Sequence, residues 1–79
     1  MVKVYPTIGS NNVTIQTAVN ENLRVEVIDL LGKRMMSIVL GSENTCVDVS
    51  SVKRGLYFIN IFNSKGFLIG AQKILKIQD

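Results

Sequence analysis

Residues 23–27 read Leu23-Arg24-Val25-Glu26-Val27 and alternate strictly between apolar and polar side chains. Successive side chains of a β-strand point to opposite faces, so this stretch presents its leucine and both valines to one side. The arginine and the glutamate then face the other way. The pattern predicts a strand with one face in a core and one face in solvent.

Working outward from this strand, similar stretches recur about every ten residues and are separated by segments rich in Gly, Asn and Ser. Helical periodicity is not found between them. The spacing predicts seven strands, at residues 2–5, 13–17, 23–27, 33–40, 45–49, 55–62 and 67–76. Such a series is typical of an all-β, seven-stranded antiparallel immunoglobulin-like β-sandwich, with a small barrel as the competing architecture.

Two of these strands also indicate which residues enter the core. The strand at 55–62 places Tyr57, Ile59 and Ile61 on one face and Leu56, Phe58 and Phe62 on the other, and we expect Tyr57 to be buried. Val47 and Val49 are expected to point inward in the same way. Cys46 lies out of phase with them, and we expect a small, semi-buried side chain there; the alternative is an exposed thiol that pairs between chains.

Length and composition fit one small folded domain covering residues 1–79. The chain has 79 residues, of which 47% are hydrophobic and 19% are charged, so it can form a core of modest size. Its longest apolar runs are four residues long, far short of the ~20 needed for a membrane helix. We therefore expect no direct membrane insertion, and we read the chain as a fragment of a larger secreted protein whose export begins upstream of Met1.

The charge distribution argues against nucleic acid as a partner. The chain has nine Lys and Arg residues and six Asp and Glu residues, which gives a net charge of +3. The adjacent pairs Lys33-Arg34 and Lys53-Arg54 lie beside Gly32 and Gly55, where solvated turns are expected. Nucleic-acid binders interleave such charges with exposed aromatic side chains, and this chain does not.

The residues for catalysis are also scarce. The sequence has no His, the commonest general base and a frequent metal ligand. Its single Cys excludes a disulfide within the chain. Asp29 and Asp48 have the most suggestive positions among the acids, and we expect them to bind backbone amides in turns. We expect no enzyme activity, no cofactor and no metal.

Several motifs, in order, resemble one family: the type A C-terminal sorting domain of proteins exported by the type IX secretion system. The match begins with Tyr5-Pro6, although the next residues here are Thr7-Ile8 where the family usually has Asn-Pro. The remaining matched segments are Val13-Thr14-Ile15, 25–33 with its Asp29 and Gly32-Lys33 turn, Val47-Asp48-Val49-Ser50, Gly55-Leu56-Tyr57-Phe58 and Lys73-Ile74-Leu75-Lys76.

The resemblance implies a secretion signal that directs a cargo protein across the outer membrane. Its partners would be an upstream cargo domain, outer-membrane translocon components and a sortase-like peptidase that usually removes the domain. The protein would pass through the periplasm and finish at the cell surface or in the medium.

The last strand is our candidate for recognition. We expect the translocon to read residues Lys73, Ile74, Leu75 and Lys76, by strand addition at an exposed edge and through the two lysine charges. The opposing interpretation is that Ile74 belongs to the core and the lysines protect the edge from aggregation. The other motif residues are expected to act through structure, and these are Pro6, Asp29, Gly32, Asp48, Gly55 and Tyr57.

Two other functions remain open at this point. An immunoglobulin-like accessory module would bind carbohydrate or a surface, usually through a row of exposed aromatic side chains. A structural domain would form a homodimer through an open strand edge, which is compatible with sorting.

Overall fold

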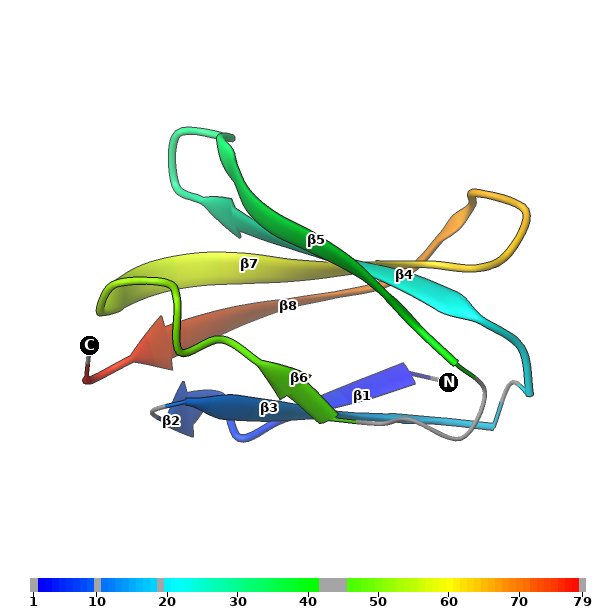
Figure 1. The fold of residues 1–79 in the computed structure, drawn as a ribbon, viewed down its shortest axis with the longest axis horizontal. Coiled ribbons are helices and arrows are strands. Elements are labelled where there is room, and N and C mark those ends of the chain that lie inside the picture. The colour runs from blue at the N-terminus through cyan, green and yellow to red at the C-terminus, as the bar shows by residue number, and fades with distance from the viewer. Residues whose placement is uncertain (1, 10, 19, 42–45, 79) are drawn as a thin grey trace.

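Every regular element in the described part of the chain is a β-strand. The computed structural model describes residues 2–9, 11–18, 20–41 and 46–78, and Figure 1 shows the path of the chain. Its strands are β1 (Val2–Tyr5), β2 (Ile8–Gly9), β3 (Asn12–Thr17), β4 (Leu23–Asp29), β5 (Arg34–Leu40), β6 (Cys46–Asp48), β7 (Gly55–Phe62) and β8 (Leu68–Lys76).

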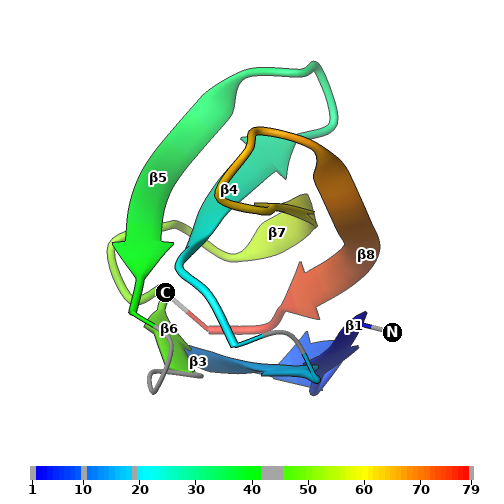
Figure 2. The same ribbon diagram turned by 90° about the vertical axis from the view of Figure 1, so that its right-hand side faces the viewer.

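The strands form two sheets that pack face to face. The smaller sheet has the order β1-β3-β6 and the larger has the order β2-β8-β7-β4-β5. Figure 2 shows the larger sheet curving over the smaller one. This arrangement confirms the predicted all-β sandwich.

The strand count differs from the prediction by one, because β2 is an eighth strand. This strand has only two residues and pairs in parallel with the end of β8, through Ile8 with Leu75 and Gly9 with Lys76. The other strand pairs are antiparallel. Between Tyr5 and Ile8 the chain crosses from the smaller sheet to the larger, and the Tyr5–Pro6 peptide bond is cis.

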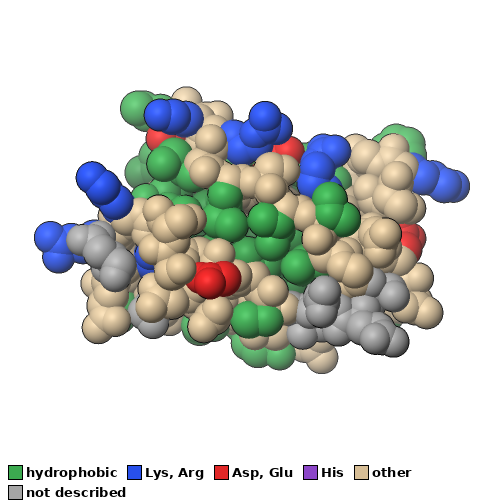
Figure 3. Space-filling view, in the orientation of Figure 1, with side chains coloured by type: hydrophobic (Ala, Val, Ile, Leu, Met, Phe, Trp, Pro, Cys, Tyr) green, Lys and Arg blue, Asp and Glu red, His purple; other side chains and the backbone are tan. Residues whose placement is uncertain are grey.

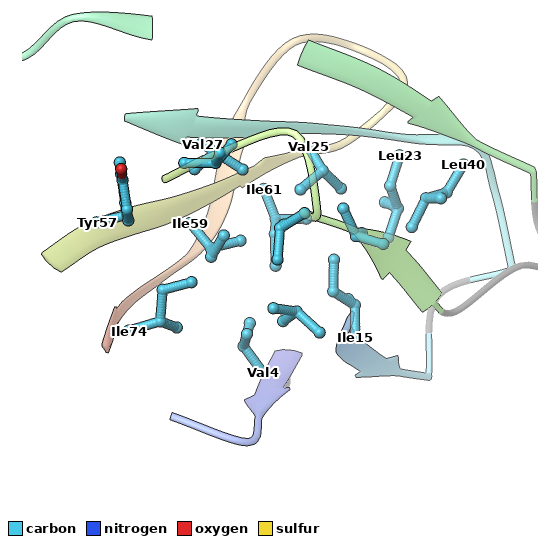
Figure 4. Close-up of a cluster of buried hydrophobic side chains, with 14 residues drawn as sticks. Val4, Ile15, Leu23, Val25, Val27, Leu40, Tyr57, Ile59, Ile61 and Ile74 are labelled. Atoms are coloured by element: carbon cyan, nitrogen blue, oxygen red, sulfur yellow. The ribbon is translucent and has the colours of Figure 1, made fainter. Parts of the chain in front are cut away.

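The core lies between the two sheets and consists almost wholly of aliphatic side chains. Figure 4 shows Val25, Ile59, Ile61 and Ile74 of the larger sheet pointing toward Val4 and Ile15 of the smaller one. Ile59 and Ile61 have no exposed surface. The residues predicted to point inward are buried, and these are Leu23, Val25, Val27, Val47, Val49 and Tyr57. Ile59 and Ile61 share the buried face of Tyr57.

Register shifts interrupt two of the strand pairs in the larger sheet. On β5 the partners of Val27 and Ile28 are Met36 and Arg34, so Met35 is the extra residue of a bulge. A second shift lies between β7 and β8, next to Gly70. Bulges bend and twist a strand locally, which fits the curvature of this sheet.

The two ends of the chain lie at opposite ends of the sandwich. Figure 1 places the start of β1 toward one end and the end of β8 at the other. The β4–β5 turn and the loop between β6 and β7 lie at the same end of the sandwich as the C-terminal end of β8 (Figure 1). The region in which recognition is expected is therefore far from the segment that enters β1.

Candidate functional site

The last four residues of β8 alternate between outside and inside. Ile74 and Lys76 are buried, with 4% and 2% of their surface exposed, whereas Lys73 and Leu75 are exposed. In a strand, residues two apart share a face, so Lys76 follows Ile74 into the sandwich. This is the signal in the sequence that could have located Lys76: if Ile74 belongs to the core, Lys76 must point the same way.

Lys76 is held by backbone carbonyls of the loop between β6 and β7. Its Nζ donates to the carbonyl oxygens of Val49 at 2.8 Å, Ser50 at 3.5 Å and Val52. A buried ammonium is costly unless its hydrogens find acceptors, and these three carbonyls provide them. Lys76 therefore fastens the last strand to this loop and does not offer its charge to solvent.

The backbone at the end of β8 is also occupied. The amide of Leu75 donates to the carbonyl of Thr7 at 2.8 Å, and the amide of Ile77 donates to that of Gly9 at 2.9 Å. Both acceptors belong to the segment that contains β2. An incoming strand would have to displace β2 before it could pair with the Lys73–Lys76 segment.

The two aspartates of the matched motifs bind turn amides. Asp29 Oδ1 accepts from the amides of Leu31 at 2.9 Å and Lys33 at 2.8 Å, which fixes the β4–β5 turn. Asp48 Oδ1 accepts from the amide of Ser50 at 2.8 Å. Hydrogen bonds from Ser50 and the charge of Lys76 hold the pKa of Asp48 below its usual value. These contacts are those of turn residues in a folded domain.

Tyr57 and Gly55 fix the start of β7. The Tyr57 hydroxyl donates to the carbonyl of Lys53, four residues earlier, at 2.6 Å. Immunoglobulin-like domains carry a similar feature, a tyrosine corner, in which a Tyr hydroxyl binds the backbone a few residues upstream. Gly55 has a φ of 150°, which side-chain-bearing residues rarely adopt. Gly32, in the β4–β5 turn, likewise has a positive φ of 87°.

The candidate nucleophiles Cys46 and Ser50 lie at exposed positions. Cys46 is exposed, so the expected semi-buried position is wrong; it lies beside Asn12 at the accessible end of β6. Ser50 and Lys53 have the Ser-x-x-Lys spacing, but both are exposed in a loop and Ser50 hydrogen-bonds Asp48. Among the residues described, His, Cys, Asp and Glu do not gather into a group able to hold a metal ion.

Comparison with known proteins identifies the family. The family described as the secretion system C-terminal sorting domain matches residues 3–77, which span the sandwich from β1 to the end of β8. The search of curated proteins found no match. In the described ranges no helix is long and apolar enough to span a membrane. The chain belongs to the family of secretion system C-terminal sorting domains, the export signals of type IX secretion.

Proposed function

We propose that this chain is the export address of a larger protein and that the outer-membrane type IX translocon reads it after it has folded in the periplasm. The observation that carries this proposal is the family match over residues 3–77. The family consists of secretion signals, and its members are exported to the cell surface or released. A signal shared by unrelated cargoes needs a surface that does not depend on the cargo, and a rigid sandwich supplies one.

The positions of the chain ends support this role. A cargo joined before β1 would lie at the end of the sandwich away from the close of β8 (Figure 1). The exposed side chains of Lys73 and Leu75 would then stay accessible while the cargo is attached. Within the four-residue segment, these two present the recognised surface, and Ile74 and Lys76 keep the strand in place.

In this proposal the domain is a substrate of the export machinery and performs no catalysis. A sortase-like peptidase would cut in the segment that joins the cargo to β1, because that segment is the natural point to separate two folded units. The cargo would remain at the surface or in the medium, and the sandwich would be discarded.

A reporter fusion tests the proposal. The 79 residues are placed behind a fluorescent protein that carries an inner-membrane signal peptide, in a bacterium with the type IX system. We expect fluorescence at the cell surface or in the medium, and mass spectrometry of the exported reporter should show that the domain has been removed.

The matched control carries Ile61→Asp, which puts a charge into the fully buried core and should prevent folding. Its reporter should stay in the periplasm. Retention of the unchanged fusion, with the domain folded, would contradict the sorting role. Export of an intact fusion would contradict only the cleavage step.

The alternative of a carbohydrate-binding module has less support. The exposed aromatic side chains of the described residues are Tyr5, Phe58 and Phe67, and they lie on β1, on β7 and in the β7–β8 hairpin. They do not form the row on one face that such modules use to stack on sugar rings.

A further inference from the structure

The outer face of the larger sheet carries a continuous strip of apolar side chains that no other part of the described chain covers. Strand pairing places Leu75 between Ile8 and Leu56, and Phe58 beside Ile28, in two neighbouring rows. Ile8 is 61% exposed, and Leu56, Phe58 and Leu75 are each more than one-third exposed. We call these five residues the apolar strip.

Two cations flank one row of the strip. Lys73 pairs with Phe58 and Arg34 pairs with Ile28, so one row runs across four strands as Lys73, Phe58, Ile28, Arg34. With neighbouring strands about 4.8 Å apart, the backbone positions of the two cations are separated by roughly 14 Å. Both side chains are exposed, and they lie on opposite sides of Phe58 and Ile28.

The same face has a surplus of positive charge. Its one carboxylate in the described segments is Glu26, which contacts Arg24 at 3.2 Å and Arg34 at 3.4 Å. This face therefore carries three cations, Arg24, Arg34 and Lys73, and one carboxylate, which is already paired with two of them. Figure 3 shows several Lys and Arg side chains along the upper side of the molecule, where the larger sheet lies.

We propose that the apolar strip docks onto a partner protein that presents a flat apolar surface bordered by carboxylates. The inference rests on the proposed function in one respect: the partner is taken to be a component of the export machinery. Apolar contact would supply affinity, and the carboxylates opposite Lys73 and Arg34 would fix the orientation and speed the encounter.

A protein surface fits this strip better than a lipid bilayer does. Leu56, Phe58 and Leu75 belong to paired strands of one sheet and expose only 36–39% of their surface. Membrane-binding elements bury their apolar face about 5–10 Å deep, beyond the headgroups. These three side chains do not protrude enough to do so, but they can meet another flat surface.

Photo-crosslinking in the exporting bacterium tests the contact. Phe58 is replaced by p-benzoylphenylalanine in the reporter fusion, and Gln16, on the outer face of the smaller sheet, receives the same group as a control. We expect a protein adduct from position 58 and none from position 16. Lys73→Glu in the same fusion should lower the yield of that adduct by about tenfold, because like charges would then meet.

Export of the reporter provides a second readout. Phe58→Ser and Lys73→Glu should each reduce export, whereas two matched variants should not: Val39→Ser, at the far end of the same face, and Lys3→Glu, on the smaller sheet. Circular dichroism of each purified chain verifies that it is folded. Equal export of all four variants, or an adduct at both positions, would overturn the proposal.

Two outcomes distinguish the docking surface from the sorting role and from binding to lipid. If the unchanged fusion and the strip variants are all exported normally, the proposed docking surface is wrong and the sorting role still holds. The 79-residue chain is also floated with vesicles of phosphatidylcholine and phosphatidylglycerol. If it floats and the Lys73→Glu variant does not, the strip binds a lipid surface and the proposal of a protein partner is wrong.

Discussion

Lys76 stands out among the individual residues because its side chain is buried and its ammonium group is held by backbone carbonyls. Three carbonyl oxygens of the β6–β7 loop accept hydrogen bonds from this ammonium group. Methionine at this position keeps much of the side-chain volume and removes the donors, so the carbonyls lose their partner. We expect Lys76→Met to lower the free energy of unfolding by about 2 kcal/mol, measured by urea denaturation.

Lys73→Met is the control for that measurement, since Lys73 belongs to the same segment but is exposed. It should change stability by no more than about 0.5 kcal/mol. An equal effect of the two substitutions would show that the carbonyl contacts of Lys76 contribute nothing particular.

Gly55 presents a second requirement at the scale of one residue, this time in the backbone. Its φ of 150° lies in a region that residues with a Cβ avoid at a cost of about 1–3 kcal/mol. We expect Gly55→Ala to destabilise the domain by that amount in denaturant unfolding. Ser51→Ala, at an exposed position of the same loop, should leave the unfolding midpoint where it is.

Tyr57 can be tested by removing a single oxygen. Tyr57→Phe keeps the buried ring and deletes the hydrogen bond to the Lys53 carbonyl. The expected loss is about 1 kcal/mol, the usual net contribution of such a bond. A phenylalanine variant as stable as the parent would mean that the ring alone fixes this corner of the sandwich.

Among the elements, the β7–β8 hairpin is tied to the segment before β4 by Glu21. The Glu21 carboxylate accepts from the amide of Ser64 at 2.8 Å and from its hydroxyl at 2.7 Å. The amide and hydroxyl hydrogen bonds from Ser64 hold the pKa of Glu21 below its ordinary value of 4.5, and the charge of Lys65 adds to this. A carboxylate with a lowered pKa in the folded state stabilises the fold when ionised.

The sign of the pH dependence follows from that direction. The stabilisation is fully present above pH 4.5, the ordinary value, and is lost as the pH falls through the lower folded pKa. Glu21→Gln removes the titration but keeps an acceptor. We expect the stability difference between the parent and Glu21→Gln to shrink on acidification below this pH, with a matching shift of the Ser64 amide signal in NMR spectra. A difference that is constant with pH would disprove the link.

The long strands could be predicted from sequence, and the short or irregular features could not. β4 alternates apolar and polar side chains from Leu23 to Val27, so its buried face follows directly from period two. β7 is apolar on both faces, so period two shows which of its eight residues share a face. β2 has two residues and therefore no period to detect. The bulge at Met35 and the exposure of Cys46 depend on how a strand pairs with its neighbour, which a single strand's pattern does not encode.

The candidate site shows the same division. Period two placed Lys73 with Leu75 and Ile74 with Lys76, but the sequence did not reveal which pair points inward. The apolar strip draws on residues from β2, β4, β7 and β8, so it exists only once the sheet order is known. Asp29 and Asp48 were predictable because their partners lie within four residues.

For the whole molecule, the last strand has two roles that a truncation cannot separate. Deletion from Ile74 onward removes a core side chain worth about 2–5 kcal/mol together with the contacts of Lys76, from a small domain whose net stability is only a few kcal/mol. We expect this deletion to abolish cooperative thermal unfolding, so its failure to be exported would report lost structure. The double variant Lys73→Ser/Leu75→Ser changes only exposed side chains of the same strand and should still unfold cooperatively. A folded double variant that is not exported would establish that the surface of β8 is read, whereas normal export of it would assign β8 a purely structural role.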